Sequence, residues 1–254
     1  MADHPTSAHE TSRLDGPETM PSAQTGWWET ERATFIRGRI GELATSGTRV
    51  IDVGCGRGTM LADDQLDGLR RFNVDSHVWD EWDVNGPMFF VCAEADALPF
   101  RDGVFDLVGS FDVLEHLPDD ERAMSEQRRV AAPGGAVATA VPADRRLWSA
   151  HDEAVGHHRR YSTTTLTELA DQSGLDVQRT THLFGFLWLP ARLLRSAPAR
   201  RSEPGNSNTV LARTTRRVIG SLCGLERWWL GRRRLPFGTS LWAECRVRPA
   251  TSRR

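Results

Sequence analysis

The sequence predicts an α/β domain built on a doubly wound, mostly parallel sheet of seven strands, with an N-terminal helical segment and a C-terminal helical cap. Three observations predict this class. Short apolar runs alternate with helical or turn-rich segments along most of the chain. A length of 254 residues suits one large domain better than two independent cores. A composition of 39% hydrophobic and 26% charged residues, with a formal net charge of -2, is ordinary for a globular protein and gives no sign of nucleic-acid binding.

The patterning divides the chain into four segments. Residues 1–24 are rich in Ser, Thr, Pro, Asp and Glu and hold almost no large apolar residue, so we expect a disordered tail. Residues 25–182 should form the core, because apolar residues recur at helical spacing within residues 27–43 and strands follow. Residues 183–238 are expected to form a basic helical cap inserted before the last strand. Residues 239–249 should be the closing strand of the core.

Strands are predicted where short apolar runs end at polar or glycine-rich turns. They are expected at Val50–Asp52, Phe72–Asp75, Phe89–Ala93, Phe105–Ser110, Gly135–Val141 and Val177–Leu183, before a closing strand in SLWAECRVR. Helices are expected between them, at Asp119–Val130 and Thr163–Gln172. Because strands and helices alternate, most of the strands should run parallel to one another.

A glycine-rich turn follows the first strand. The stretch Asp52-Val-Gly54-Cys-Gly56-Arg-Gly58 places three glycines where the chain must turn sharply and let a ligand approach the backbone. A helix should start directly after this turn. At the end of the next strand, Asp75 lies at about the 20-residue offset from which a carboxylate binds a ribose diol. The G-x-G-x-G spacing and the acid two positions before it favour a ligand with an ammonium group and no phosphate.

The turn resembles the signature of the class I S-adenosylmethionine (SAM)-dependent methyltransferases, which reads V-I-D-V-G-C-G-R-G almost verbatim at residues 50–58. Three further segments, AEADALPFRDGVFDLV, FDVLEHL and RRVAAPGGAVATAVP, are similar to that family. The resemblance covers residues 26–182 and extends to a bacterial subgroup of small-molecule methyltransferases similar to types 11 and 12. It implies a Rossmann-like fold, with SAM as the cofactor and S-adenosyl-L-homocysteine (SAH) as the product.

The resemblance also assigns contacts to the cofactor. Asp52 and the glycine turn would hold the methionine end, Asp75 the ribose hydroxyls, and Glu94 with Ala95 the adenine edge. The family usually has Gly-Asp where this chain has an Ala-Glu pair, so either Glu94 or Asp96 would reach the adenine amine. The full set of expected cofactor residues is Asp52, Gly54, Cys55, Gly56, Asp75, Ser76, Glu94, Ala95 and Phe111.

The segment LWSAHDEAVGHHRRYS, residues 147–162, combines three imidazoles with carboxylates and guanidiniums and follows the fifth strand, so it should border the acceptor pocket. A bacterial subgroup of the family has a similar L-W-S-x-H-D-x-x-x-G-H-x-R-R-Y segment, with H-W-W-F-x-x-R near its start where this chain has GWWETER. The expected acceptor-binding residues are Trp27, Trp28, Arg32, Trp148, Asp152, Arg160 and Tyr161. A solvated loop in which Asp152 pairs with a nearby arginine is the competing interpretation.

Methyl transfer from a sulfonium depends mainly on holding the reacting atoms in line, and a base is needed only when the acceptor has a proton to lose. The candidates for a catalytic role are His157, His151, His116 and Glu115. Asp112, Glu115 and His116 also share one helix face, as in similar clusters of the ubiquinone-pathway O-methyltransferases, where a divalent cation assists. We expect instead that Asp112 caps the helix and that no metal is bound, there or in the polar segment.

The basic residues concentrate near the C-terminus. Residues 183–254 hold 15 Arg against 3 Glu, and all 32 basic residues of the chain are Arg. Within this part, Val218, Leu222, Leu225 and Trp229 form a helical stripe bordered by arginines. We expect the stripe to pack on the domain as a cap over the acceptor pocket. Peripheral contact with an anionic membrane, where a lipid-linked acceptor would be methylated, is the alternative.

The remaining patterns bear on location and partners. The four cysteines have no C-x-x-C spacing, and neither a signal peptide nor a membrane-spanning run is evident, so we expect a cytoplasmic protein. The absence of a base-flipping motif argues against a nucleic-acid partner. The predicted function is SAM-dependent methyl transfer to an oxygen or nitrogen of a small-molecule acceptor in bacterial specialised metabolism. A SAM-binding regulatory or partner protein without transferase activity is the alternative.

Overall fold

Seven strands form one sheet in the order β3-β2-β1-β4-β5-β7-β6, and among them β7 runs antiparallel to both neighbours while the other pairs are parallel. The strands are β1 (Arg49–Val53), β2 (Arg70–Asp75), β3 (Met88–Cys92), β4 (Phe105–Phe111), β5 (Ala131–Pro142), β6 (Leu175–Leu183) and β7 (Ser240–Val247). The computed structural model describes residues 27–195, 210–231 and 233–248. The predicted tail, residues 1–24, lies outside the described residues. The mostly parallel sheet of seven strands is confirmed.

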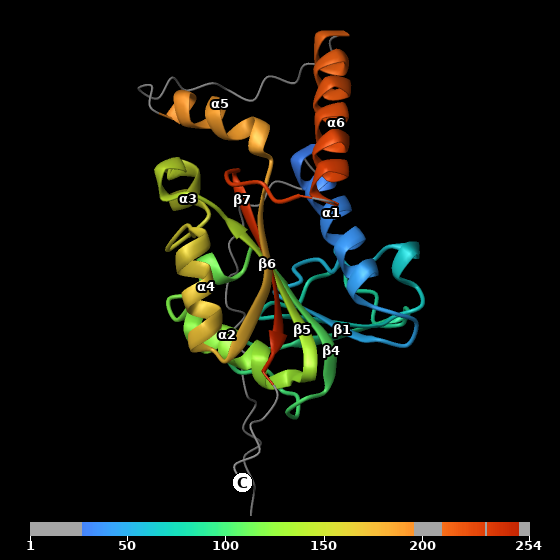
Figure 1. The fold of residues 1–254 in the computed structure, drawn as a ribbon. Helices are drawn as coiled ribbons and strands as arrows, with labels where there is room; N and C mark the ends of the chain where they lie inside the picture. Colours follow the sequence, from blue (N-terminus) through green and yellow to red (C-terminus); the bar gives the residue numbers. More distant parts are fainter. Residues whose placement is uncertain (1–26, 196–209, 232, 249–254) are drawn as a thin grey trace, which may run out of the picture.

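Helices cover both faces of this sheet (Figure 1). They are α1 (Trp27–Leu43), α2 (Asp120–Val130), α3 (Ala150–Ala154), α4 (Thr163–Gln172), α5 (Gly185–Arg195) and α6 (Val210–Leu230). On one face, Met124 of α2 and Leu166 of α4 belong to a buried cluster with Val108 of β4. On the other face, Ile36 of α1 packs in a second cluster with Trp242 of β7. The two clusters make a three-layered core, as a doubly wound sheet requires.

Local capping explains where two of the predicted helices begin. The Asp119 carboxylate accepts a hydrogen bond from the amide of Arg122 at 2.9 Å, which satisfies a free donor in the first turn of α2. Ser162 and Thr165 form a reciprocal capping box at the start of α4. Helix α4 therefore starts at the predicted residue, and α2 starts one residue later than predicted because Asp119 is its N-cap.

The helix predicted directly after the glycine turn is absent, and this prediction was wrong. The chain between β1 and β2 contains only a single 3₁₀ turn, Asp64–Leu66. The buried guanidinium of Arg71 binds the carbonyls of Leu61 at 3.0 Å and Asp63 at 3.3 Å, which removes acceptors that a helix would need. The Asp63 side chain also accepts from the amide of Gln65, a local bond that competes with helix formation.

The predicted buried stripe of α6 was also wrong. Val218, Leu222, Leu225 and Trp229 are all at least 40% exposed, whereas Cys223 and Leu230 are buried. The reason lies in Glu226, whose carboxylate accepts from the amides of Phe184 and Gly185 at the start of α5. Glu226 shares a helix face with Cys223 and Leu230, so this bond turns that face inward and leaves the neighbouring apolar face in solvent. None of the described helices is both long and apolar enough to cross a bilayer.

Candidate functional site

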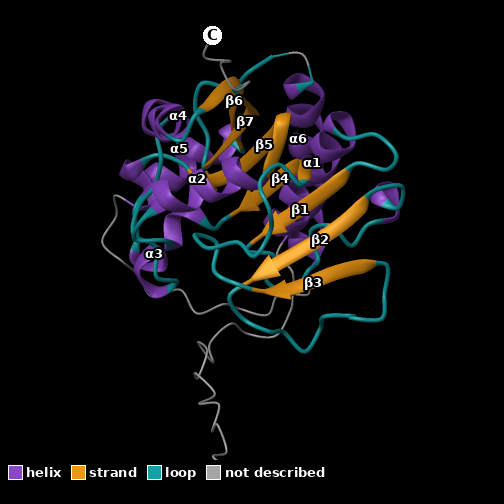
Figure 2. Cartoon of the chain, turned by 90° about the horizontal axis from the view of Figure 1, so that it is seen from below, coloured by secondary structure: helices purple, strands orange, loops and turns teal. Residues whose placement is uncertain are grey.

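The carboxyl ends of β1, β2 and β3 lie at one edge of the sheet (Figure 2), and the glycine turn starts there. The amides of Gly54 and Cys55 both donate to the carbonyl of Val74, at 2.7 and 2.9 Å, which folds the turn over the end of β2. Gly54 has a φ of 75°, and a Cβ there would stand 2.3 Å from a methyl carbon of Val113. Only glycine fits this position, so the turn presents bare backbone to a ligand.

The carboxylate of Asp75 meets the turn across the strand ends. It accepts from the amide of Gly56 at 2.8 Å and from the amide of His77 at 3.0 Å. The indole of Trp82 donates to the carbonyl of Gly56 at 2.8 Å from the opposite side. The two bonds to Asp75 fix its carboxylate beside the glycine turn, and its binding of a ribose stays a prediction.

Asp52 is a buried carboxylate that forms no ion pair with any residue that the structure describes. It is 1% exposed, and its Oδ1 has no hydrogen-bond partner among the described residues. Burial, together with the nearby charge of Asp75, raises the pKa of Asp52 to about 8. A buried acid in this state would gain from a positively charged partner. The ammonium of an amino-acid ligand at the glycine turn supplies such a partner, so the residues present fit SAM.

The other expected cofactor residues lie in the turn after β1 and at the ends of β2, β3 and β4. Ser76 and Glu94 are exposed, and Ala95 is half-buried. Asp96 forms an ion pair with Arg122 at 3.4 Å. No ion pair to Glu94 occurs within the described ranges, and which of the two acids reaches the adenine stays a prediction. The remaining members, Cys55 and Phe111, are buried, and Phe111 stacks on the indole of Trp242.

Helix α1 brings two expected acceptor residues to the end of β4. Arg32 is 4% exposed, lies over the ring of Trp28 at 4.9 Å, and forms an ion pair with Asp112. Asp112 has a φ of 58°, a left-handed conformation that aims its side chain at α1. The prediction that Asp112 caps the following helix was wrong, because this ion pair occupies it and Val113 takes the N-cap position without a side-chain bond. The side chain of Trp27 lies outside the description.

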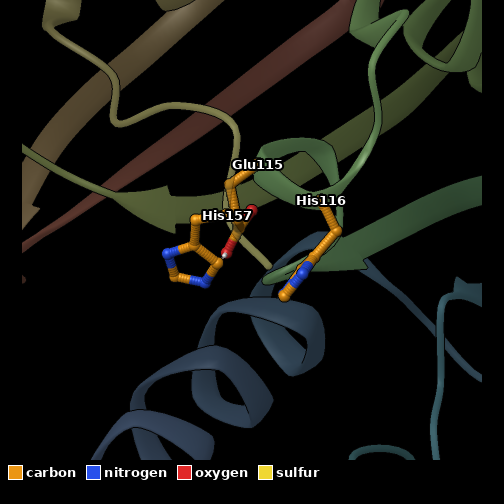
Figure 3. A group of neighbouring side chains, drawn as sticks. All are labelled: Glu115, His116 and His157. Carbon is orange, nitrogen blue, oxygen red and sulfur yellow. Dashed lines mark ion pairs between the residues drawn. The ribbon is translucent and has the colours of Figure 1, made fainter. Parts of the chain in front are cut away.

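Three expected catalytic side chains meet just after β4 (Figure 3). Glu115 is fully buried between the imidazoles of His116 and His157, and neither of its carboxylate oxygens has a hydrogen-bond partner among the described residues. His157 Nε2 lies 4.0 Å from Glu115 Oε1. Burial, followed by the charge of Asp112, raises the pKa of Glu115 well above its ordinary range. Burial and the neighbouring His157 lower the pKa of His116.

The polar loop joins this cluster through a backbone bond from the amide of His158 to the carbonyl of Glu115 at 2.7 Å. Asp152 is fully buried, contacts His157 Nδ1 at 2.9 Å and accepts from Arg160 Nε at 2.7 Å. Burial opposes ionisation of Asp152, but the bonds from Arg160 and His157 outweigh it and lower its pKa to about 2. The ionised Asp152 holds the proton of neutral His157 on Nδ1, so Nε2 faces Glu115 as an acceptor.

The other loop residues separate into two groups. His151 is exposed on α3 and is not brought to the cluster. Trp148, Arg160 and Tyr161 line a cavity of about 950 Å³ beside the loop. The solvated-loop interpretation is correct that Asp152 pairs with an arginine, but that pair is buried. What the sequence pattern could not show is the meeting of His157 with Glu115 and His116, since the loop and the end of β4 are far apart in the chain.

The cluster also has the composition of a metal site. Glu115, His116 and His157 each offer one ligand atom, and these atoms lie within 4.8 Å of one another. Two imidazoles and a carboxylate are ligands that divalent transition metals accept. Asp152 would stand behind His157 as the second-layer carboxylate common in such sites. The expectation that no metal binds here stays a prediction.

Comparisons with known proteins agree with this geometry. A family model described as a methyltransferase domain matches residues 28–180. The chain is 26% identical to malonyl-[acyl-carrier protein] O-methyltransferase of Pseudescherichia vulneris, over 78% of this chain and 80% of that protein. It is 28% identical to 27-O-demethylrifamycin SV methyltransferase of Amycolatopsis mediterranei (strain S699), over 44% of this chain and about half, 48%, of that protein.

A solved structure shows the same fold. The 1,6-didemethyltoxoflavin-N1-methyltransferase of Burkholderia thailandensis, bound to 1,6-didemethyltoxoflavin and SAH, superposes with a TM-score of 0.52. The match covers 89% of this chain and 80% of that one at 15% identity. The family model spans more than half of the chain, and the buried acid and bare glycine turn fit the cofactor of that family. The chain therefore belongs to the class I SAM-dependent methyltransferases and uses SAM as its cofactor.

Proposed function

We propose that the protein methylates an oxygen or nitrogen of a small-molecule acceptor in the bacterial cytoplasm, as a step of specialised metabolism. One relative is named malonyl-[acyl-carrier protein] O-methyltransferase, and another is named 27-O-demethylrifamycin SV methyltransferase. A structural neighbour is named 1,6-didemethyltoxoflavin-N1-methyltransferase. SAM, when bound, supplies an electrophilic methyl group on a sulfonium. The residues of this chain have to hold the cofactor, orient the acceptor and remove its proton.

Cofactor binding is assigned to the strand ends. Asp52 would pair with the ammonium group of the amino-acid end, the backbone of the Gly54 turn would pass beside it, and Asp75 would accept from the ribose hydroxyls. Pairing with a cation would let Asp52 ionise, which removes the cost of its burial. Exposed Glu94 would face the adenine amine.

Proton removal is assigned to His157. Its Nε2 would accept the proton of an acceptor hydroxyl or ammonium, and the imidazolium that forms would be stabilised by Asp152, 2.9 Å from Nδ1. Arg160 in turn keeps Asp152 ionised and in place. Glu115, whose pKa is raised by burial and by the charge of Asp112, lies next to that nitrogen, with Oε1 4.0 Å from Nε2. The Asp152–His157 pair directed at Glu115 is the single observation that carries this proposal.

The experiment compares two histidines of the same loop. His157→Ala should lower the turnover number about 10²-fold or more without weakening the binding of SAH, because only the proton transfer is lost. His151→Ala is the matched control, since His151 is exposed and outside the cluster, and it should leave turnover unchanged. Labelled SAM with a panel of hydroxyl- and amine-bearing acceptors supplies the assay. Equal rates for both variants would contradict the role of His157.

The same assay tests the alternative of a regulatory or partner protein. Tight SAM binding with no methyl release to any acceptor of a broad panel would favour it. The buried cluster of Glu115, His116 and His157 supports the enzyme, because a pure binding module has no use for a base beside the cofactor.

A lipid-linked acceptor at a membrane surface is a second candidate, favoured by the exposed face of α6. Leu222, Leu225 and Trp229 stand 40%, 61% and 46% exposed, and Leu189 and Leu193 of α5 are exposed as well. The chain from residue 183 to 254 is strongly basic. Such a combination suits the interface of an anionic bilayer. Sedimentation with anionic vesicles at low salt tests it, and protein that stays in the supernatant would remove this candidate.

A further inference from the structure

A cavity of about 950 Å³ lies beside the polar loop but is lined by none of the expected cofactor residues and by none of Glu115, His116 and His157. Its walls come from the loop after β5, the start of α4, the end of β6, α5 and the turn before β7. Its volume is that of a site for a small organic molecule. Trp148, Arg160 and Tyr161, which the sequence predicts to bind the acceptor, are among its lining residues.

The cavity is lined by four arginines, Arg145, Arg146, Arg159 and Arg160, against a single carboxylate, Asp144. The oxygens of Asp144 are already occupied, by Arg146 and by the indole of Trp188 at 2.7 Å. Burial opposes ionisation of Asp144, but these bonds outweigh it and lower its pKa to about 2. Its charge is therefore matched within the protein. Arg159 and Arg160 are paired as well, with Asp120 and Asp152, so the net positive charge of the wall comes from Arg145.

Arg145 is therefore the cavity arginine on which an anionic ligand would depend. Its side chain is exposed, and no ion pair to it occurs in the part of the chain that the structure describes. Ser162 and Thr163, at the start of α4, line the cavity with it. The amide groups of a first helical turn lack acceptors within the helix, so they add partial positive charge on that side.

Aromatic side chains form an apolar part of the wall. Trp148, Trp188 and Phe237 line the cavity, and Phe237 is 47% exposed. The guanidinium of Arg146 lies 5.3 Å from the ring centroid of Trp188, which keeps the ring in place. Guanidiniums beside exposed rings bind a planar or apolar body that carries an oxyanion, because the rings cover the body and the arginines contact its oxygens.

We propose that this cavity binds a small molecule that carries a phosphate or carboxylate group on an aromatic or apolar body. Arg160 connects it to the cluster, because Arg160 lines the cavity and donates at 2.7 Å to Asp152, the carboxylate that holds His157. The ligand is either the anionic end of the methyl acceptor or a separate effector, and the shared chemistry is the oxyanion.

Calorimetry that measures the binding of phenyl phosphate to the full-length protein, with SAH present, tests the proposal without any turnover. Arg145→Ala should lower the affinity for phenyl phosphate about fivefold, because a positive charge at the wall is lost. Arg145→Glu should lower this affinity further, because the charge is reversed. Arg101→Ala is the matched control, since Arg101 is exposed and does not line the cavity. Phenol, which lacks the oxyanion, should not bind. SAH affinity should be equal in all variants.

Two results would overturn the proposal: no saturable binding of phenyl phosphate at millimolar concentration, or equal affinity in the wild type and Arg145→Glu. A kinetic arm separates the two sources of the oxyanion. If the ligand is the acceptor, Arg145→Glu raises KM for anionic acceptors and leaves KM for neutral ones unchanged. If it is an effector, phenyl phosphate changes turnover without competing with the acceptor. Failure of methyl transfer with every acceptor leaves the binding measurement intact, so the two proposals fail separately.

Discussion

Replacing Asp52 with Asn should remove a pH-dependent cost of folding. Burial raises the pKa of Asp52 from 3.8 to about 8, so the folded protein favours its neutral form. For an acid shifted in this direction, the cost is absent below about pH 4, grows by about 1.4 kcal/mol per pH unit, and becomes constant above about pH 8. The Asn side chain is neutral at every pH. Between pH 5 and pH 9 the stability of Asp52→Asn relative to the wild type should therefore rise by about 4 kcal/mol.

Urea unfolding of both proteins without cofactor, at each pH unit from 5 to 9, measures this difference. A constant offset from the buried amide does not affect the result, because only the change with pH is used. Asp80→Asn, at an exposed carboxylate, should track the wild type at every pH. If the stability difference for Asp52→Asn does not change with pH, Asp52 is not an uncompensated buried acid. Its assignment to the ammonium of SAM would then lose its physical basis.

Three further predictions follow from the same site. Asp75→Ala should weaken the binding of SAH, measured by calorimetry, about tenfold or more, because two amides lose their acceptor and the ribose loses its carboxylate. An unchanged SAH affinity would refute the ribose assignment. Gly54→Ala should lower the free energy of unfolding by about 2 kcal/mol or more, because the new Cβ would overlap Val113 at a φ of 75°. The control is Gly41→Ala on α1, where a Cβ meets open space, and this change should be neutral or stabilising. Equal urea midpoints for the two variants would show that the turn relaxes. Chelator should leave methyl transfer unchanged, and a loss restored by one divalent cation would instead make His157 a metal ligand.

Much of the fold follows from local patterns, because most strands bury a short apolar run and two helices begin at capping side chains, although β3 has no buried residue. The pairing of β1 with β2 places Val53 beside Val74, so Asp75 had to come close to the glycine turn once those strands were predicted. The sequence pattern failed where a distant side chain decides the outcome. Arg71 binds the carbonyls that a helix after the turn would need. Glu226 selects the buried face of α6 by reaching back to the start of α5.

The same distinction between local patterns and distant contacts applies to the candidate site. Asp52, the glycine turn and Asp75 lie within one strand, loop and strand unit, and motif spacing was enough to group them. The meeting of His157 with Glu115 depends on a loop that returns across the sheet and is attached by one backbone bond from His158. Residue types in the loop indicated chemistry, but nothing local distinguishes His157 from His151. Only the buried Asp152 beside His157 makes that distinction.

The segment that carries α5 and α6 leaves the sheet at Leu183 and re-enters it at Ser240, and these two residues are partners in the antiparallel pairing of β6 with β7. The segment is a long connection between two adjacent antiparallel strands, where a short hairpin turn would be enough. Closing a longer connection between fixed ends costs little extra free energy, because the cost grows only with the logarithm of its length. The segment could therefore be lengthened, trimmed or exchanged between relatives while the strands keep their register, which would allow acceptor choice to evolve independently of cofactor binding.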